Sequence, residues 1–256
     1  MSSAPSNAQV NRIDIIRPDA PSLAAYGDYD IGVRTLTLVD PGRVDILNTQ
    51  AGAEAAIYDR KLTVEVWYPG KLETGQSRGG EYQAITRNPE IIATLSGQAV
   101  RDTAPDTPAA AKGAFPLVVI SHGYPGNRYL LSHLGENLAS KGFVVVSIDH
   151  ADSTYDDMQA FSSTLYNRPL DQRFVIESMA ELSADTNSFL AGMLDANNTG
   201  VVGYSMGGYG LVNNLGGGYS DEVVPSYMAP PNELLALHAA SNPEYRSNLD
   251  SRIKAG

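Results

Sequence analysis

Residues 200–208 have the sequence GVVGYSMGG, in which a short apolar run leads into a G-x-S-x-G pattern centred on Ser205. Apolar residues recur through Leu211 to Leu215, as they would in a helix. This order predicts a buried strand, a sharp turn and a helix. Gly203 and Gly207 are the small residues that such a turn needs, because side chains there would collide with the neighbouring backbone. We expect the turn to present the Ser205 hydroxyl at the carboxyl end of a sheet.

The residues upstream predict a strand, a helix and a second strand. Residues 117–120 and 143–148 are continuous apolar runs, which are typical of parallel strands covered on both faces. Between them, leucines recur at helical spacing from Leu130 to Leu138, and Gly142 follows as a left-handed cap. A second helix is expected from about Pro169, where proline is tolerated in a first turn. The alternation predicts an α/β fold with a mostly parallel, doubly wound sheet.

The amino-terminal part differs from this pattern. Ile31–Val39 and Leu62–Tyr68 are expected to be antiparallel strands, the second half-buried because apolar and polar residues alternate. Residues 40–42 (Asp-Pro-Gly) have turn chemistry. We expect residues 71–112 to form a surface insertion with a short helix near 91–95, and residues 216–250 to form a cap-like or connecting segment. Residues 1–256 are interpreted as one domain.

Composition excludes several classes of function. The net charge is −11, so a basic face for nucleic acid is not expected. The absence of cysteine removes disulfides, thiolate metal sites and a cysteine nucleophile. The four histidines have no ligand-like spacing, no nucleotide-binding glycine motif occurs, and neither a metal nor a cofactor is expected. No membrane span or export signal is visible, so a cytoplasmic location is the default expectation.

Two motifs together favour a catalytic serine. A glycine-rich turn such as residues 203–208 can serve packing alone, and the short pattern also occurs by chance. However, residues 121–126 (SHGYPG) close the earlier strand, and this kind of turn offers one of the two amides of an oxyanion hole. The helix behind Ser205 adds further amide donors and a favourable dipole. The pair of motifs predicts acyl-transfer chemistry at Ser205.

These motifs resemble a known family. The segments 62–69 (LTVEVWYP), 122–126 (HGYPG), 147–150 (SIDH) and 203–208 (GYSMGG) are similar to α/β-hydrolases grouped as predicted dienelactone hydrolases and platelet-activating factor acetylhydrolase-like esterases. The resemblance covers roughly Ile31 to Leu215. True dienelactone hydrolases carry a cysteine nucleophile, which this chain lacks.

The resemblance implies an α/β-hydrolase fold and a serine esterase that works through an acyl-enzyme. Ser205 would be the nucleophile, and the backbone amides of Tyr124 and Met206 would form the oxyanion hole, with His122 and Gly123 in the oxyanion turn. A small-molecule or lipid-like ester would be the substrate. Tyr124 and Met206 are also similar to a residue pair in polyester-cleaving cutinase-like hydrolases, which makes a polyester a further option.

The acid and the histidine of a triad are harder to find. In this superfamily both follow the serine; the one histidine that does so here is His238, the two aspartates are Asp221 and Asp250, and Asp250 comes after the histidine. We interpret His238 as a surface or cap-helix residue, with a role as the base as the lesser alternative. Residues 252–255 look like the start of a fourth buried strand, so the chain resembles a hydrolase truncated at its carboxyl end. The alternative function is a catalytically incomplete fragment or a non-catalytic binding module.

Other polar residues receive structural interpretations. His122 is expected to be a hydrogen-bonding residue of its turn, His133 a surface residue, and His150 a residue that could line the pocket. Three charged residues near the expected start of the second helix would form a cap and an ion pair: Arg168, Asp171 and Arg173.

Overall fold

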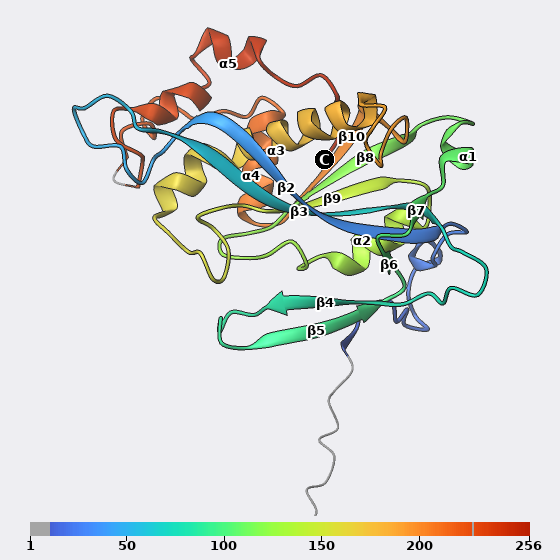
Figure 1. Cartoon of the computed structure of the whole chain (residues 1–256). Helices are drawn as coiled ribbons and strands as arrows, with labels where there is room; N and C mark the ends of the chain where they lie inside the picture. Colours follow the sequence, from blue (N-terminus) through green and yellow to red (C-terminus); the bar gives the residue numbers. More distant parts are fainter. Residues whose placement is uncertain (1–10, 227) are drawn as a thin grey trace, which may run out of the picture.

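The central feature of the fold is a mixed β-sheet with helices on both faces (Figure 1). It is described from a computed structural model, which covers residues 11–226 and 228–256. The strands are β1 (Asn11–Arg12), β2 (Asp30–Val44), β3 (Ile57–Lys71), β4 (Gly80–Ile85), β5 (Ile92–Gly97), β6 (Val100–Arg101), β7 (Ala104–Pro105), β8 (Phe115–Ser121), β9 (Val144–Asp149), β10 (Leu194–Gly203) and β11 (Ile253–Ala255). The helices are α1 (Thr107–Ala110), α2 (Ser132–Ala139), α3 (Phe161–Ala184), α4 (Met206–Asn214) and α5 (Pro243–Ser247), with 3-10 turns η1 (Ser22–Ala24) and η2 (Leu234–His238).

The parallel centre of the sheet agrees with the sequence prediction. The sheet order is β11-β10-β8-β9-β3-β2-β6, and β10, β8 and β9 run parallel, with Val118 paired to both Val145 and Gly200. β3 is antiparallel to β9, and β2 is antiparallel to β3, which confirms the antiparallel strands at the amino-terminal side. β11 pairs with β10 in parallel, so residues 252–255 do lead into a strand, but this strand lies at the edge of the sheet and is half-buried to exposed, and the expectation of a buried strand is wrong. The carboxyl ends of β8, β9 and β10 therefore meet at one edge.

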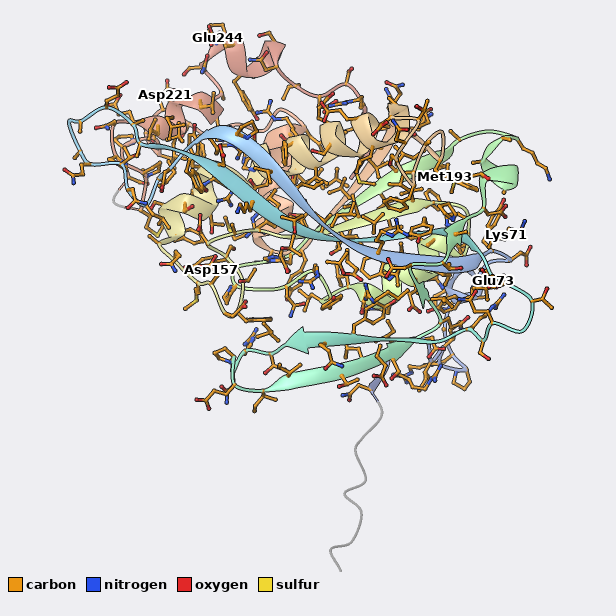
Figure 2. The ribbon with its side chains drawn as sticks, in the orientation of Figure 1. Lys71, Glu73, Asp157, Met193, Asp221 and Glu244 are labelled. Carbon is orange, nitrogen blue, oxygen red and sulfur yellow. The ribbon has the colours of Figure 1, made fainter. Side chains whose placement is uncertain are left out.

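β3 is buried on both faces, so the prediction of a half-buried strand is wrong. Val64 and Val66 pack in the core that includes Val175 and Ile176 of α3. On the opposite face, Trp67 packs against α2 at Gly135, where a Cβ atom would lie only 2.8 Å from the indole ring. Both layers thus remove apolar surface from water, at about 1.5–3 kcal/mol for each large side chain. Figure 2 shows how side chains fill the space between the sheet and its neighbours.

The expected turn at residues 40–42 is a β-bulge. β2 continues through these residues, and its register with β3 shifts between Asp40 and Arg43. Gly42 takes a φ of 71°, and Pro41 has no N–H to donate to a ladder. A β-bulge inserts an extra residue that has no partner on the neighbouring strand. It therefore tolerates both the positive φ of Gly42 and the missing N–H of Pro41, and these turn residues bend the strand without ending it.

Residues 71–112 contain a small second sheet. β4 and β5 form an antiparallel hairpin, and β1 adds to β5 in parallel, so the helix expected near residues 91–95 is wrong. The hairpin is held on α2 by the buried carboxylate of Glu136, which accepts bonds from the amides of Gln98 (2.8 Å) and Ala99 (3.1 Å) and from the hydroxyl of Tyr82. These long-range pairings override the local helical pattern.

α3 begins at Phe161, so the prediction of a helix start at Pro169 is wrong. Pro169 lies inside the helix and cannot donate to the carbonyl of Leu165. The hydroxyl of Tyr209, on α4, donates to that carbonyl at 2.7 Å. The contact between the two helices therefore compensates for the proline. Within the described residues, neither α3 nor any other helix combines the length and the apolar character needed to cross a membrane.

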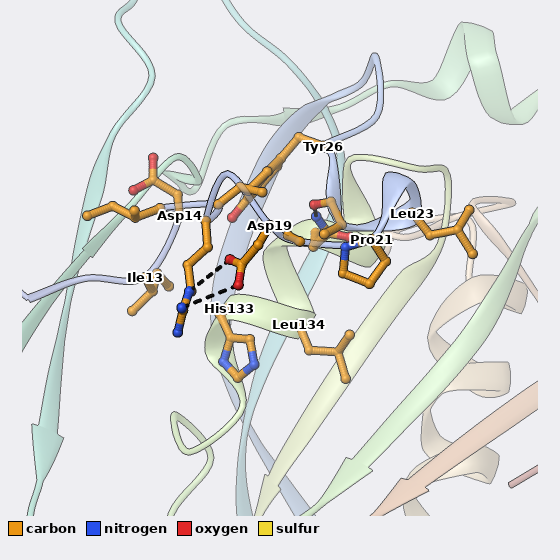
Figure 3. A pocket seen from close by; sticks show the side chains of 14 residues that line it. Ile13, Asp14, Asp19, Pro21, Leu23, Tyr26, His133 and Leu134 are labelled. Atoms are coloured by element: carbon orange, nitrogen blue, oxygen red, sulfur yellow. Dashed lines mark hydrogen bonds and ion pairs between the residues drawn. The ribbon is translucent and has the colours of Figure 1, made fainter.

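A pocket of about 570 Å³ lies between residues 13–24 and α2 (Figure 3). Tyr26, His133 and Leu134 contribute to its lining, and His133 is exposed as expected. None of the predicted site residues lines it.

Candidate active site

Ser205 occupies a strained turn between β10 and α4. Its backbone has φ 53° and ψ −116°, a positive φ that residues with a side chain rarely adopt. The amide of the preceding Tyr204 donates to the carbonyl of Ser121 at 3.0 Å, which ties the turn to the end of β8. Ser205 is exposed to solvent. The strain thus holds a serine hydroxyl out from the carboxyl edge of the sheet.

The two glycines that flank Ser205 have no room for a side chain. A Cβ atom on Gly207 would lie 1.9 Å from the carbonyl oxygen of Ser121. A Cβ atom on Gly203 would lie 2.5 Å from the carbonyl group of Gly207. Since backbone atoms make both contacts, a side chain at either position would have to displace the turn.

The turn at residues 121–126 packs directly on this serine. A Cβ atom on Gly123 would lie 3.1 Å from Cβ of Ser205 and 3.5 Å from its hydroxyl oxygen. Met206 is the first residue of α4, so its amide has no partner within the helix. In residues 11–226 and 228–256, the amide of Tyr124 donates none of the described hydrogen bonds. Two amide donors, at Tyr124 and Met206, therefore adjoin the exposed hydroxyl.

His122 is a buried hydrogen-bonding residue, as expected. The carbonyl of Gly123 can only accept, so His122 Nδ1 donates to it at 2.7 Å, and His122 Nε2 accepts from the amide of His150 at 3.2 Å. Burial, followed by the charge of Arg168, lowers the pKa of His122 well below its usual range. The imidazole is therefore neutral and fixed in one tautomer.

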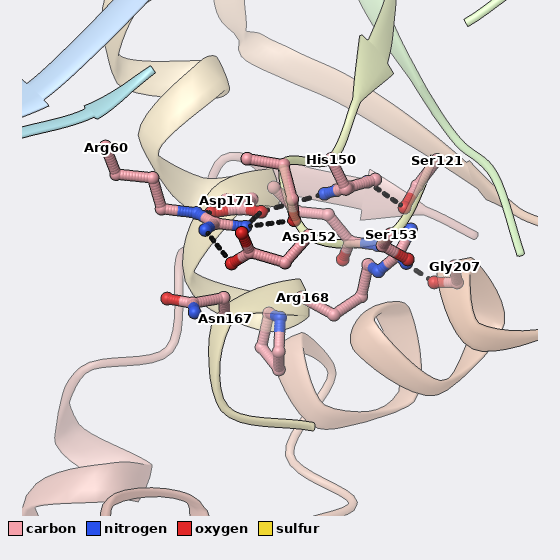
Figure 4. A network of polar contacts seen from close by, with 12 residues as sticks. Arg60, Ser121, His150, Asp152, Ser153, Asn167, Arg168, Asp171 and Gly207 are labelled. Atoms are coloured by element: carbon pink, nitrogen blue, oxygen red, sulfur yellow. Dashed lines mark hydrogen bonds and ion pairs between the residues drawn. The ribbon is translucent and has the colours of Figure 1, made fainter. Parts of the chain in front are cut away.

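A buried Ser-His-Asp arrangement that does not include Ser205 lies next to this turn (Figure 4). Ser121 Oγ lies 2.8 Å from His150 Nε2, and His150 Nδ1 lies 2.9 Å from Asp171. Arg60 makes two further bonds to Asp171, at 2.8 and 2.9 Å. The three members are at most 1% exposed, so His150 does not line an open pocket, contrary to one expectation.

The pKa values of this buried network are fixed by its partners. Burial, and then the charge of Arg168, lowers the pKa of His150 to about 3. Burial opposes ionisation of Asp171, but the charge of Arg60 and the bond from His150 outweigh it and hold the pKa of Asp171 well below its usual range. The network therefore holds a carboxylate and a neutral imidazole at neutral pH.

One turn of α3 contacts both halves of the site. Arg168 donates to the carbonyls of His122 (2.6 Å) and Gly123 (3.3 Å), and Gln172 Nε2 donates to the carbonyl of Gly207 (2.8 Å). Burial lowers the pKa of Arg168 to about 9, which leaves it protonated at neutral pH.

The cap expected from Arg168, Asp171 and Arg173 is wrong, because these residues lie inside α3. Asp171 does form ion pairs, with Arg60 and Arg43, whereas Arg173 donates to the carbonyl of Asn248. Sequence reasoning did not assign a role in the site to Arg168, Asp171 or Gln172. Their i, i+3, i+4 spacing on a helix is the signal that could have placed them on one face.

His238 is buried, so the expectation of a surface residue is wrong. Its Nε2 donates to the carbonyl of Tyr166 at 3.0 Å, and its ring lies between those of Tyr166 and Tyr245. Burial lowers the pKa of His238 to about 4. Across the part of the chain that the structure describes, none of the four histidines has a hydrogen bond to Ser205.

The two aspartates that follow Ser205 also have other partners. Asp221 accepts from the hydroxyl of Ser241, and Asp250 pairs with Arg252 at 2.8 Å. No group of three or more histidine, aspartate or glutamate side chains that could hold a metal ion occurs among residues 11–226 and 228–256.

Known proteins are similar to this chain in sequence and in structure. The chain is 36% identical over 98 residues to cutinase est1 of Thermobifida alba, a match that covers 38% of this chain and 29% of the cutinase. It is 37% identical over 98 residues to cutinase 2 of Thermobifida cellulosilytica, covering 38% of this chain and 33% of that protein. The solved structure of a ferulic acid esterase from Streptomyces cinnamoneus superposes with a TM-score of 0.52 at 27% identity, over 79% of this chain and 57% of the esterase.

The matched segments thus span about a third or less of the cutinases and just over half of the esterase. These relatives agree with the α/β-hydrolase fold expected from the sequence. A family profile described as "PETase: PET hydrolase-like" matches residues 86–217, which is just over half of the chain and contains both the turn at residues 121–126 and Ser205. The chain therefore belongs to the PET hydrolase-like family.

Proposed function

We propose that this protein cleaves carboxylic esters through an acyl-enzyme formed on Ser205. The observation that carries the proposal is the packing of Gly123 against Ser205, 3.5 Å from the hydroxyl oxygen to a Cβ position on the glycine. This contact brings the turn at residues 121–126 and the strained serine together in the arrangement that acyl transfer needs.

The proposed reaction uses the two free amides. The hydroxyl oxygen of Ser205 attacks the ester carbonyl, and negative charge develops on the carbonyl oxygen. The amides of Tyr124 and Met206 donate to that oxygen, and the dipole of α4 favours the charge. Losing one such donor typically costs about 10²–10³ in turnover. The alcohol then leaves, and water releases the acid from the serine ester.

A base must take the proton of Ser205 for this reaction to be fast. His238 is the only histidine that follows Ser205 in the sequence. To act as the base, its Nε2 would have to exchange the bond to the carbonyl of Tyr166 for one to Ser205. An acid partner for such a histidine stays unassigned.

The proposed substrates are small or lipid-like carboxylic esters, with a polyester as a further option. The similarity to cutinases and to a ferulic acid esterase supports ester cleavage in general. The narrower resemblance to predicted dienelactone hydrolases and platelet-activating factor acetylhydrolase-like esterases, and the location in the cell, stay predictions.

A non-catalytic binding module with an α/β-hydrolase fold is the second candidate. It is favoured by the hydrogen bonds that His122, His150 and His238 already make to groups other than Ser205. In this case Ser205 would be exposed but weakly reactive.

Labelling with a fluorophosphonate, followed by peptide mapping, separates the two candidates. We expect Ser205 to be modified, Ser205→Ala to remove the label, and p-nitrophenyl butyrate to be hydrolysed only by the unchanged protein. The absence of both label on Ser205 and turnover would favour the second candidate, and label on another residue would contradict the assignment of the nucleophile.

A further inference from the structure

The peptide group between Gly123 and Tyr124 is bonded at its carbonyl end by two buried side chains. His122 Nδ1 donates to the Gly123 carbonyl at 2.7 Å, and Arg168 Nη2 donates to it at 3.3 Å. The N–H at the other end of this peptide belongs to Tyr124, one of the two amides of the proposed oxyanion hole. The same peptide group therefore joins a buried cation to a free donor beside Ser205.

The Arg168 guanidinium is placed to act through this peptide. The residue is 1% exposed, and its other described bonds go to the carbonyl of His122 at 2.6 Å and to the hydroxyl of Ser153. The nearby carboxylate of Asp171 is bonded by Arg60, Arg43 and His150. Within the described residues Arg168 has no ion pair, so its charge is directed at the carbonyls of the turn.

The second amide of the proposed oxyanion hole, that of Met206, belongs to a peptide whose carbonyl is bonded by a neutral donor. Met206 N–H belongs to the peptide whose carbonyl is that of Ser205, and this carbonyl accepts from the amide of Tyr209 at 3.1 Å. Both amides thus belong to peptides that are hydrogen-bonded at the opposite end. Only the peptide of Tyr124 is bonded by a cation.

We propose that Arg168 and His122 are positioning residues that polarise the Gly123–Tyr124 peptide and so strengthen the Tyr124 amide as a donor to the oxyanion. This inference rests on the proposed function of Ser205. Because the peptide is conjugated, a bond to its oxygen draws electron density from its nitrogen and makes the N–H a better donor. Charge-assisted bonds have the larger effect. The stabilisation by the Tyr124 hydrogen bond grows with the negative charge on the substrate oxygen, and this charge is largest in the transition state. The polarisation therefore affects kcat more than KM.

The test compares Arg168→Met with Arg173→Met. Arg173 is on the same helix and donates to the carbonyl of Asn248, away from the turn, so it is a matched control. Two readouts are used: the second-order rate of fluorophosphonate labelling at Ser205, and kcat and KM with p-nitrophenyl butyrate. We expect Arg168→Met to lower the labelling rate and kcat about 10- to 100-fold, with KM changed less than about twofold. Arg168→Lys, which keeps the charge, restores part of the loss, and Arg173→Met stays within about twofold of the parent.

A second measurement follows the peptide itself. The amide ¹⁵N and ¹H resonances of Tyr124 move upfield in Arg168→Met and move less in Arg168→Lys, because the bond to the Gly123 carbonyl is lost or weakened. His122→Phe removes the other donor to this carbonyl and shifts the same resonances in the same direction. If circular dichroism and a thermal melt show that Arg168→Met does not fold, His122→Phe alone tests whether the Gly123–Tyr124 peptide is polarised through its carbonyl.

The outcomes separate this inference from the proposed function. Absence of label on Ser205 in the parent protein would refute the proposed function, while the resonances of Tyr124 would still test the polarisation. Label on Ser205 with an unchanged rate in a folded Arg168→Met or His122→Phe variant would overturn the inference alone. So would a Tyr124 amide whose resonances do not move in either variant.

Discussion

Ser121 donates a 2.8 Å hydrogen bond to His150, and neither side chain reaches solvent. With Asp171 they reproduce the bonding order of a catalytic triad, at the end of the strand next to the one that carries Ser205. Hydrogen bonds alone would point to Ser121 and not to the proposed nucleophile, Ser205. Accessibility and backbone geometry separate the two serines, because Ser205 is exposed in a strained turn and Ser121 is buried at the end of a regular strand.

We predict that Ser121→Ala leaves the fluorophosphonate label on Ser205 in place. The substitution removes the donor to His150 Nε2, so this buried nitrogen loses its bond. The free energy of unfolding should fall by about 1–3 kcal/mol. Urea unfolding measures the stability, and peptide mapping of the parent protein checks that Ser121 carries no label. Label on Ser121 would contradict the structural role of this group.

Gly207→Ala should disrupt the serine turn. The new methyl group would lie 1.9 Å from the carbonyl oxygen of Ser121, so the backbone must move and the stability should fall by at least about 1–3 kcal/mol. We expect labelling of Ser205 to slow by more than about tenfold. Gly200→Ala, on the preceding strand β10, is the control, because no heavy atom lies nearer than 4.0 Å to its Cβ position. Equal effects of the two substitutions would argue against a close-packed turn.

The stability should depend on pH through the buried histidines. His150 and His238 have folded-state pKa values of about 3 and about 4, below the value of about 6.5 in an unfolded chain. Between these values the unfolded state binds more protons, so stability is full above pH 6.5 and is lost as the pH falls toward 4. The loss at pH 5 should be about 2 kcal/mol for each of the two. Urea unfolding at pH 7.5 and pH 5.0 measures it.

The matched variants for this experiment are His238→Gln and His133→Gln. The first removes one buried imidazole and should reduce the loss of stability between the two pH values. The second changes an exposed residue and should leave that loss unaltered. If the loss of stability between pH 7.5 and pH 5.0 changed in His133→Gln and not in His238→Gln, the buried histidines would not be its cause.

Tyr209→Phe tests how α3 accommodates its proline. The change removes the donor to the Leu165 carbonyl and should lower the free energy of unfolding by about 1–3 kcal/mol. In a Pro169→Ala background the helix can supply its own amide to that carbonyl, so the same change should cost less. A double-mutant cycle by urea unfolding measures the coupling. Additive effects would mean that the hydroxyl does not compensate for the proline.

The sequence predicted the parts of the fold that rest on local patterns. Strands β8 and β9 and the end of β10 contain apolar runs, and the spacing of Gly203, Ser205 and Gly207 defines the turn after β10. The start of α3 and the hairpin of β4 and β5 were missed, because each depends on partners distant in the sequence. Tyr209 supports the helix across Pro169, and Glu136 binds the amides of Gln98 and Ala99.

The candidate site shows the same division. Ser205 and the turn containing Gly123 and Tyr124 were predicted from motifs. The role of Arg168 was not, because its partners are backbone carbonyls, and no sequence pattern records which carbonyl a side chain will reach. The burial of His238 was missed for a related reason: Tyr166 and Tyr245 enclose it from other segments.

The contacts of Arg168 and Gln172 also constrain how relatives of this protein can diverge. These two side chains, one helical turn apart, bind two separate segments: the carbonyl of Gly123 in the loop after β8, and the carbonyl of Gly207 in the first turn of α4, directly after the loop that holds Ser205. A small rotation of α3 would displace both loops at once. A change in the sequence of either loop therefore requires a compensating substitution on the helix. Among homologues, positions 168 and 172 should therefore covary with the two loops, and grafting either loop into another hydrolase should succeed only when this turn of α3 is transferred with it.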